Sequence, residues 1–312
     1  YFRPILWCNS KIWQAMKKLI LLIVIGFVSS SCLRMDSFLY NPDDSISEYL
    51  LDDFKGETEI DLDPSYALPE STQHVFTLTS DVDGDLASIY AVYVGDISSI
   101  ATDTVILYLH GNAGHLDYYW PRIKLLANVG EKNRFGVLAI DYRGYGLSEG
   151  TPSEEALYAD SDAALKWLKE NGLTDDRLII YGFSMGTAPA TELAANARTM
   201  QPSKLMLEAP FASDEVMVQD ASGLSLPGSF FTNLEINNAE EIAKVNEPFF
   251  WIHGTADSFL SIETHGEVVY KNYNGSYSVA HRVQGGEHRD VPAIMGYKSY
   301  SDVVLEFIEY AP

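Results

Sequence analysis

The sequence predicts an α/β fold built on a doubly wound, mostly parallel sheet. Short, continuously apolar runs recur along the chain with helical stretches between them, and such runs are typical of strands buried on both faces of a sheet. Because strand–helix alternation with right-handed crossovers produces parallel strands, the pattern favours a doubly wound sheet. The runs that we assign to buried strands are 104–109, 136–140, 177–181, 204–207 and 248–252.

Two further elements are well defined by their own patterns. Residues 75–79 and 86–94 alternate between apolar and polar side chains, as expected for a half-exposed antiparallel pair before the parallel strands. The clearest helix begins after the N-cap residue Ser153 and ends at Asn171-Gly172, where glycine permits the left-handed turn that closes helices.

The composition describes an acidic globular protein. The 312 residues include 21 basic and 44 acidic side chains, for a net charge of −23, and 46% of the residues are hydrophobic. Such a charge repels nucleic acid, so we expect no nucleic-acid partner. The two cysteines are too few for a disulfide framework or a zinc site.

The N-terminus has the pattern of an export signal. We expect residues 1–15 to be upstream, non-native translation, and residues 16–31 to be a signal peptide with a basic start, an apolar run and small residues at its end. The cysteine that follows resembles the lipidated first residue of bacterial lipoproteins, although Ser29 stands where those signals usually have leucine. We therefore predict a protein exported and anchored through Cys32 to a bacterial envelope membrane, facing the periplasm or the cell surface. A plain signal peptide or a short membrane anchor is the alternative.

Residues 32–69 form an acidic segment before the domain that we expect at residues 70–312. Residues 36–63 carry ten acidic side chains and one basic one, which is typical of a solvated spacer. Aromatic and aliphatic residues are interleaved with the acids, however, and this interleaving suggests that part of the segment packs on the domain.

The pattern Gly-x-Ser-x-Gly occurs twice. In a nucleophile elbow this pattern joins a strand directly to a helix, and the glycines remove side chains that would collide at the bend. Residues 182–186 follow an apolar strand and lead into a helix rich in small residues, so Ser184 fits this context. Residues 146–150 follow a polar, glycine-rich loop and precede Thr151-Pro152, so Ser148 is expected in a structural turn.

A catalytic triad is predicted from Ser184, Asp257 and His288. Serine is a weak nucleophile that requires a base, and the base requires an acid to orient it. Asp257 follows a buried strand, and His288 lies in a glycine-flanked loop between a strand at 278–283 and a last helix near 294–310. Glu208 and Asp214, which follow the strand that ends at residue 207, are the rival acids.

An oxyanion hole needs two backbone N–H groups that face the developing negative oxygen. We expect one from Met185, directly after the nucleophile, and the other from Asn112, in the loop that follows a buried strand. His110 and His253 both stand before a glycine at a strand end, and we interpret them as packing or loop-shaping residues rather than bases.

Taken together, these motifs resemble the α/β-hydrolase superfamily, and in particular its branch of monoacylglycerol-lipase-like and serine-aminopeptidase-like serine hydrolases. The resemblance covers roughly residues 70–310. It implies a Ser184–His288–Asp257 triad, an oxyanion hole at Asn112 and Met185, no cofactor, and a short lid at about 209–247 in place of a full cap domain. The residues that carry it are 110–114, 141–146, 182–186, 207–211, 253–257 and 286–288.

The predicted function is hydrolysis of a carboxylic ester or thioester of a small molecule through an acyl-enzyme on Ser184. One alternative is a serine exopeptidase or amidase of the same fold, in which Glu208 or Asp214 would hold the substrate amine. The other alternative is a catalytically silent lipoprotein that serves as a binding module.

Overall fold

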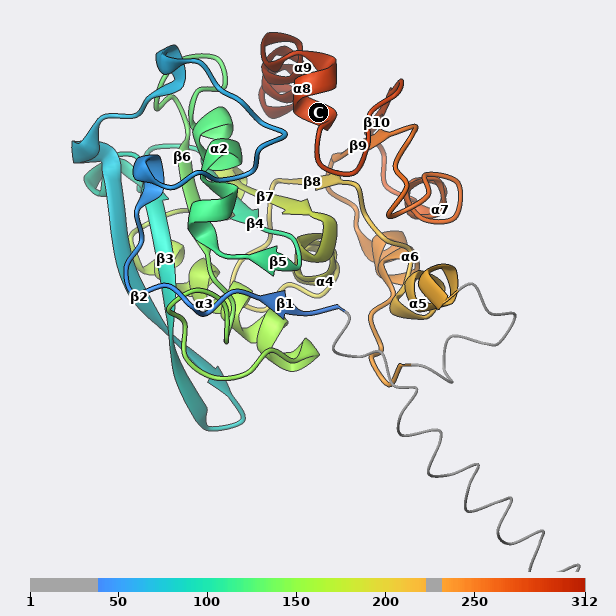
Figure 1. Cartoon of the computed structure of the whole chain (residues 1–312), viewed down its shortest axis with the longest axis horizontal. Helices are drawn as coiled ribbons and strands as arrows, with labels where there is room; N and C mark the ends of the chain where they lie inside the picture. Colours follow the sequence, from blue (N-terminus) through green and yellow to red (C-terminus); the bar gives the residue numbers. More distant parts are fainter. Residues whose placement is uncertain (1–38, 223–231, 312) are drawn as a thin grey trace, which may run out of the picture.

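The computed structural model describes residues 39–222 and 232–311. Its central sheet has eight strands in the order β10-β9-β8-β7-β4-β6-β3-β2 (Figure 1). The pairs β2–β3 and β3–β6 are antiparallel and the other neighbours are parallel. The predicted doubly wound, mostly parallel sheet is thereby confirmed. Its strands are β2 (Gln73–Val82), β3 (Asp85–Val94), β4 (Val105–Leu109), β6 (Gly136–Ile140), β7 (Leu178–Phe183), β8 (Lys204–Glu208), β9 (Phe249–Gly254) and β10 (Ser278–Val283).

Helices cover both faces of this sheet. One face packs against α3 (Glu154–Glu170), α4 (Thr187–Ala195) and α7 (Gly266–Asn272), and the other against α2 (Leu116–Ala127) and α9 (Tyr297–Glu309). Ser153 caps α3 as expected, because its side chain accepts a hydrogen bond from the N–H of Ala156. The remaining helices are α5 (Asp214–Ser222), α6 (Asn238–Glu241) and α8 (Val291–Met295), with 3-10 turns η2 (Leu51–Asp53), η3 (Pro64–Tyr66), η4 (Glu70–Thr72), η5 (Ile97–Ser99), η6 (Asp175–Arg177), η7 (Ser184–Gly186) and η9 (Ile242–Lys244).

The strand β4 shows why the central runs are continuously apolar. Val105, Leu107 and Leu109 belong to the core on one side of the sheet, whereas Ile106 and Tyr108 belong to the core on the other side. Successive side chains of a strand point to opposite faces, so a strand covered on both faces requires apolar residues at every position.

The described part of the acidic segment is packed on the domain. Its short strand β1 (Asn41–Pro42) pairs in parallel with β5 (Ala113–Gly114), the strand that follows the loop after β4 (Figure 1). Glu57 is 2% exposed and accepts a 2.7 Å hydrogen bond from Nε of Arg122 on α2. Residues 39–69 therefore contribute to the folded body instead of forming a solvated spacer.

Two regions differ from the simplest sequence expectation or lie partly outside the structure. The helix expected near 294–310 is two helices, α8 and α9, because Gly296 between them has a φ of +83°, which no continuous helix accepts. The predicted lid at 209–247 contains α5, α6 and η9, while its residues 223–231 lie outside the described residues.

Candidate active site

Ser184 lies on a sharp bend between β7 and α4. Its φ is +52°, which is uncommon for a residue other than glycine and typical of strained functional turns. The flanking glycines are required by the close approach of backbone atoms. A Cβ on Gly182 would lie 2.5 Å from the carbonyl oxygen of Gly186, and a Cβ on Gly186 would lie 2.0 Å from the carbonyl oxygen of Leu109. The first of the two Gly-x-Ser-x-Gly segments thus has the geometry of a nucleophile elbow.

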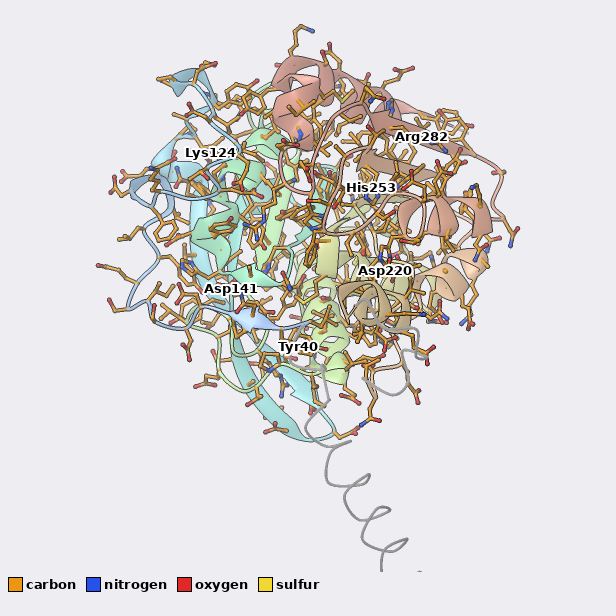
Figure 2. All side chains as sticks on the ribbon, turned by 45° about the vertical axis from the view of Figure 1, so that its right-hand side comes forward. Tyr40, Lys124, Asp141, Asp220, His253 and Arg282 are labelled. Atoms are coloured by element: carbon orange, nitrogen blue, oxygen red, sulfur yellow. The ribbon has the colours of Figure 1, made fainter. Side chains whose placement is uncertain are left out.

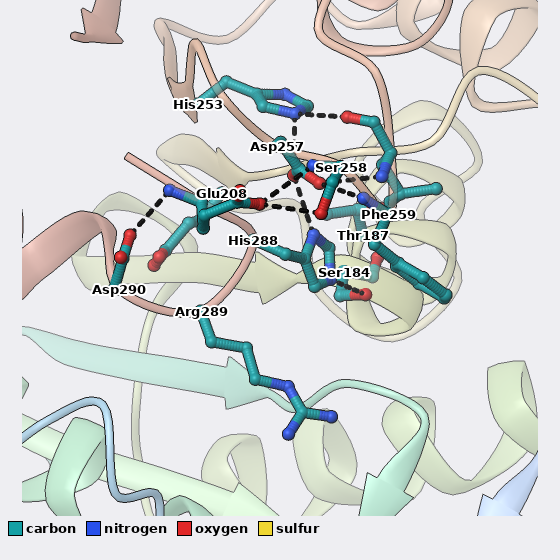
Figure 3. A network of polar contacts seen from close by, with 12 residues as sticks. Ser184, Thr187, Glu208, His253, Asp257, Ser258, Phe259, His288, Arg289 and Asp290 are labelled. Atoms are coloured by element: carbon teal, nitrogen blue, oxygen red, sulfur yellow. Dashed lines mark hydrogen bonds and ion pairs between the residues drawn. The ribbon is translucent and has the colours of Figure 1, made fainter. Parts of the chain in front are cut away.

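The structure brings Ser184, His288 and Asp257 together. Nε2 of His288 lies 2.8 Å from Oγ of Ser184, and its Nδ1 lies 2.8 Å from Oδ2 of Asp257 (Figure 3). Ser184 is 4% exposed and Asp257 is 7% exposed, so the contacts are made largely away from water. Since a carboxylate accepts the Nδ1 proton, Nε2 is left to accept the proton of the serine hydroxyl.

Asp257 is held in its ionised form by a set of donors. The N–H groups of Phe259 and Leu260 donate to its Oδ1 at 3.0 and 2.7 Å. Burial raises the pKa of Asp257, but the hydrogen bonds from His253 and His288 outweigh it and hold the pKa well below its usual value. The carboxylate is therefore available to orient the imidazole of His288 at any pH near neutral.

His253 is a partner of Asp257 that the sequence analysis missed. Its Nε2 lies 3.1 Å from Oδ2 of Asp257 and 3.0 Å from the carbonyl oxygen of Leu260. Both partners accept, so Nε2 carries the proton. Figure 3 shows His253 and His288 reaching Asp257 from two sides. The four-residue spacing in 253–257 was the available signal, but we had interpreted this histidine only as a packing or loop-shaping residue.

The residues expected to form the oxyanion hole lie at the same place. Met185 directly follows Ser184 in the turn η7 and is buried. Asn112 lies in the loop between β4 and β5 and lines the cavity into which Ser184 opens. Met185 is thus next to the nucleophile in the chain, and Asn112 shares its cavity, which is compatible with the expected oxyanion hole.

The cavity at Ser184 has a volume of about 630 Å³. Its walls come from the N-terminal segment, the loop after β4, helix α2, the elbow after β7, and the loops after β9 and β10. The acidic segment thus contributes to the site as well as to the fold. The lining residues are Tyr40, Asn41, Glu59, Gly111, Asn112, Ala113, Tyr119, Phe183, Ser184, Phe259, Glu287, His288, Arg289 and Asp290.

The rival acids and the second serine have other partners. Glu208 accepts hydrogen bonds from Nη1 of Arg122 at 2.7 Å and from the hydroxyl of Tyr181 at 2.6 Å. Asp214 is buried at the start of α5, and burial raises its pKa to about 6. The hydroxyl of Ser148 donates to the carbonyl of Asp141, as expected for a residue that stabilises a turn.

Some predicted features cannot be placed. Cys32, the signal at 16–31 and the segment 1–15 lie outside the described residues. No helix among residues 39–222 and 232–311 is long and apolar enough to cross a membrane. Over the same residues, no group of three or more His, Cys, Asp or Glu side chains has an arrangement that could hold a metal ion.

The sheet and this site are those of an α/β hydrolase fold, and the comparisons with known proteins agree. Residues 104–225 match the family model described as alpha/beta hydrolase fold. The chain is 30% identical over 207 residues to the alpha/beta hydrolase domain-containing protein 17C of Homo sapiens, a match covering 66% of this chain and 58% of that protein. It is also 30% identical over 208 residues to protein 17B of Xenopus laevis, covering 65% of each. The chain thus spans less than two thirds of the length of these relatives.

Solved structures show the same fold at lower identity. The Pyrococcus furiosus esterase Pf2001 superimposes with a TM-score of 0.63 at 18% identity, covering 87% of this chain and 97% of that one. Est1E of Butyrivibrio proteoclasticus, with ferulic acid bound, superimposes with a TM-score of 0.58 at 17% identity, covering 74% and 97%. The family model and the solved structures agree on the α/β-hydrolase fold.

Proposed function

We propose that this protein is a serine hydrolase that cleaves a carboxylic ester or thioester through an acyl-enzyme on Ser184. One observation carries the proposal: Oγ of Ser184, the imidazole of His288 and the carboxylate of Asp257 form a continuous chain with two contacts of 2.8 Å. A hydroxyl, a base and an orienting acid in that arrangement are the components of nucleophilic acyl transfer.

The proposed reaction has two steps. In the first, Oγ of Ser184 attacks the carbonyl carbon while Nε2 of His288 takes the hydroxyl proton. The tetrahedral intermediate then collapses, and His288 returns that proton to the departing alcohol or thiol. In the second, His288 takes a proton from water, the resulting hydroxide attacks the acyl-enzyme, and Ser184 leaves with the proton. The N–H groups of Asn112 and Met185 stabilise the negative oxygen in both steps.

The cavity favours a small-molecule substrate. Its volume of about 630 Å³ falls within the range of ordinary ligand pockets. An exopeptidase would need a carboxylate there to hold the substrate amine, and the predicted candidates were Glu208 and Asp214. Among the described residues that line the cavity, neither occurs. Three other carboxylates, those of Glu59, Glu287 and Asp290, do line the cavity, so the exopeptidase stays an alternative that the substrate panel must separate from the esterase.

A substrate panel tests the proposal. We expect p-nitrophenyl esters to be hydrolysed with a pre-steady-state burst of nitrophenol close to one equivalent per protein, because acylation precedes deacylation. Thioesters of the same acyl chains should also react, and aminoacyl p-nitroanilides should react far more slowly. Faster turnover of the anilides would favour the exopeptidase. No turnover of any ester of the series would favour the catalytically silent binding module.

We also propose that the protein is exported and anchored through a lipid on Cys32. The support is the sequence pattern at 16–32, since a basic start, an apolar run and a following cysteine are typical of lipoprotein signals. Metabolic labelling with an alkyne fatty acid in a bacterial host should label the native chain and not Cys32→Ser. Equal labelling of both would contradict the anchor.

A further inference from the structure

The peptide group between Gly111 and Asn112 is fixed by a hydrogen bond to its carbonyl oxygen. Nδ1 of His110 lies 2.7 Å from the carbonyl oxygen of Gly111, inside the protein. A carbonyl oxygen only accepts, so Nδ1 of this histidine carries a proton and donates it. In a trans peptide, the C=O and N–H groups point in opposite directions. The N–H of Asn112 therefore points away from His110.

A second buried group fixes His110. Its Nε2 lies 3.1 Å from Oδ1 of Asp141, and both side chains are fully buried. This is a close polar contact between buried groups, although it lacks the geometry of a hydrogen bond. The hydroxyl of Tyr49 donates to the other oxygen of Asp141 at 2.6 Å. Asp141, labelled in Figure 2, is thereby held between the histidine and the N-terminal segment.

Aromatic rings prevent the imidazole of His110 from turning. The ring of Tyr119 stacks on it at a centroid distance of 4.8 Å, and the rings of Tyr142 and Tyr145 lie at 4.5 and 5.5 Å. A buried polar ring carries a desolvation cost, which simple packing could avoid with an apolar side chain. The two polar contacts of His110 thus indicate more than filling of space.

The next peptide is also fixed. The carbonyl of Asn112 accepts hydrogen bonds from the N–H of Asn41 at 2.9 Å and from the hydroxyl of Tyr145 at 3.1 Å. Because the peptides on both sides of the Asn112 Cα are held, this residue has little freedom to rotate.

We propose that His110 and Asp141 are positioning residues for the oxyanion hole: Asp141 orients His110, and His110 ties the Gly111 carbonyl so that the Asn112 N–H faces the substrate oxygen. A hydrogen bond to the carbonyl also polarises the peptide and strengthens its N–H as a donor. This inference rests on the proposed serine-hydrolase function, since it assigns the two residues a role in that reaction. It explains why the strand-end histidine and the 141–146 motif, which the triad does not use, lie directly behind the site.

Two substitutions of His110 separate its two contacts. In His110→Asn, the amide nitrogen takes the place of Nδ1 and can still donate to the Gly111 carbonyl. In His110→Gln, the longer amide takes the place of Nε2 and keeps only the contact with Asp141. His74 on β2 provides the matched control, because its Nε2 lies 3.1 Å from the carbonyl oxygen of Gly95, the residue that follows β3.

The experiment measures kcat and KM on a p-nitrophenyl ester together with the Ki of a trifluoromethyl ketone, whose hemiketal oxyanion would occupy the hole. We expect His110→Gln to lower kcat by about 10²-fold, as for the loss of one oxyanion donor, with KM within about threefold. The Ki should rise in parallel. His110→Asn should recover most of kcat, Asp141→Asn should fall between the two, and His74→Asn should match the native protein.

End-point labelling by a fluorophosphonate shows whether each variant is folded with a competent Ser184. If the native protein is not labelled and does not turn over esters, the proposed function fails. If native and variant proteins are labelled to completion but His110→Asn and His110→Gln lose the same kcat, or neither loses any, the positioning role is wrong. A loss confined to KM, with Ki unchanged, also contradicts it.

Discussion

Two segments of this protein have the same Gly-x-Ser-x-Gly pattern and opposite roles in its structure. At 182–186 the serine has a positive φ, follows the central strand β7 and faces His288. At 146–150 the hydroxyl of Ser148 accepts from the N–H of Tyr90 at 2.8 Å and donates to the carbonyl of Asp141 at 2.7 Å. The first hydroxyl faces a base and the second is used by the backbone. The comparison teaches that the strand before the motif and the helix after it, and not the five-residue pattern alone, place a serine hydroxyl opposite a histidine.

The largest expected difference between the two serines is in turnover. Ser184→Ala removes the proposed nucleophile and should lower kcat on a p-nitrophenyl ester by about 10⁴-fold or more. Ser148→Ala should leave kcat within about threefold, because that hydroxyl only joins two backbone groups. Steady-state kinetics of the two purified variants measures both. Comparable losses of kcat in folded samples of both variants would break the comparison.

The second test removes the acid that only the elbow serine depends on. Asp257→Asn should lower kcat by about 10³- to 10⁴-fold, since the amide no longer holds His288 in the productive tautomer. In the native protein the lowered pKa of Asp257 keeps its carboxylate ionised above pH 4. The pH profile of kcat/KM between pH 4 and 8 should then show one ionisation on its acidic side. A second acidic ionisation in this range would contradict the assignment.

The same lowered pKa has a consequence for stability. A depressed carboxyl pKa stabilises the folded state above the unfolded value of 3.8, and this stabilisation is lost as the pH falls through the folded pKa. Urea unfolding should therefore show the stability difference between the native protein and Asp257→Asn unchanged from pH 8 to 5. The difference should shrink only below pH 4.

The third test compares the last glycine of each segment. A Cβ on Gly186 would lie 2.0 Å from the Leu109 carbonyl oxygen, so Gly186→Ala forces the elbow apart and should cost at least about 3 kcal/mol in the free energy of unfolding. Gly150 has a φ of +86° but its nearest Cβ contact is 3.3 Å, so Gly150→Ala should cost about 1 kcal/mol. Equal urea midpoints for the two variants would show that the elbow is less crowded than described.

The last test concerns the contribution of the Ser148 hydroxyl to stability. Ser148→Ala leaves the N–H of Tyr90 without its side-chain acceptor in a largely buried turn, which should cost about 1–3 kcal/mol. Ser148→Thr keeps a hydroxyl and serves as the matched control. We predict that Ser148→Ala lowers the urea midpoint and that Ser148→Thr lowers it less. An unchanged midpoint for both variants would show that the hydroxyl does not stabilise the turn.

The sheet could be predicted because a parallel strand buried on both faces appears in the sequence as a short, continuous apolar run. Each apolar run begins or ends within two residues of an observed strand, and Ser184 and Asp257 both follow such runs. His288 follows the more exposed strand β10. The packing of the acidic segment on the domain was harder to predict from the sequence. Glu57 is buried only because Arg122, sixty-five residues further along, supplies its charge partner, and no local pattern encodes that pairing. The contact of His253 with Asp257 was missed for a similar reason. The sequence alone does not show whether a histidine packs in the core, binds a ligand or orients a neighbouring side chain.

The most direct test of this account is to locate the covalent adduct of a fluorophosphonate on the native protein by peptide mass spectrometry. We predict an adduct on the peptide that contains Ser184 and none on the peptide that contains Ser148, with the Ser184 adduct forming far more slowly in His288→Gln. An adduct on Ser148, or an equal rate of reaction at Ser184 without the imidazole, would contradict the assignment of the nucleophile and its base.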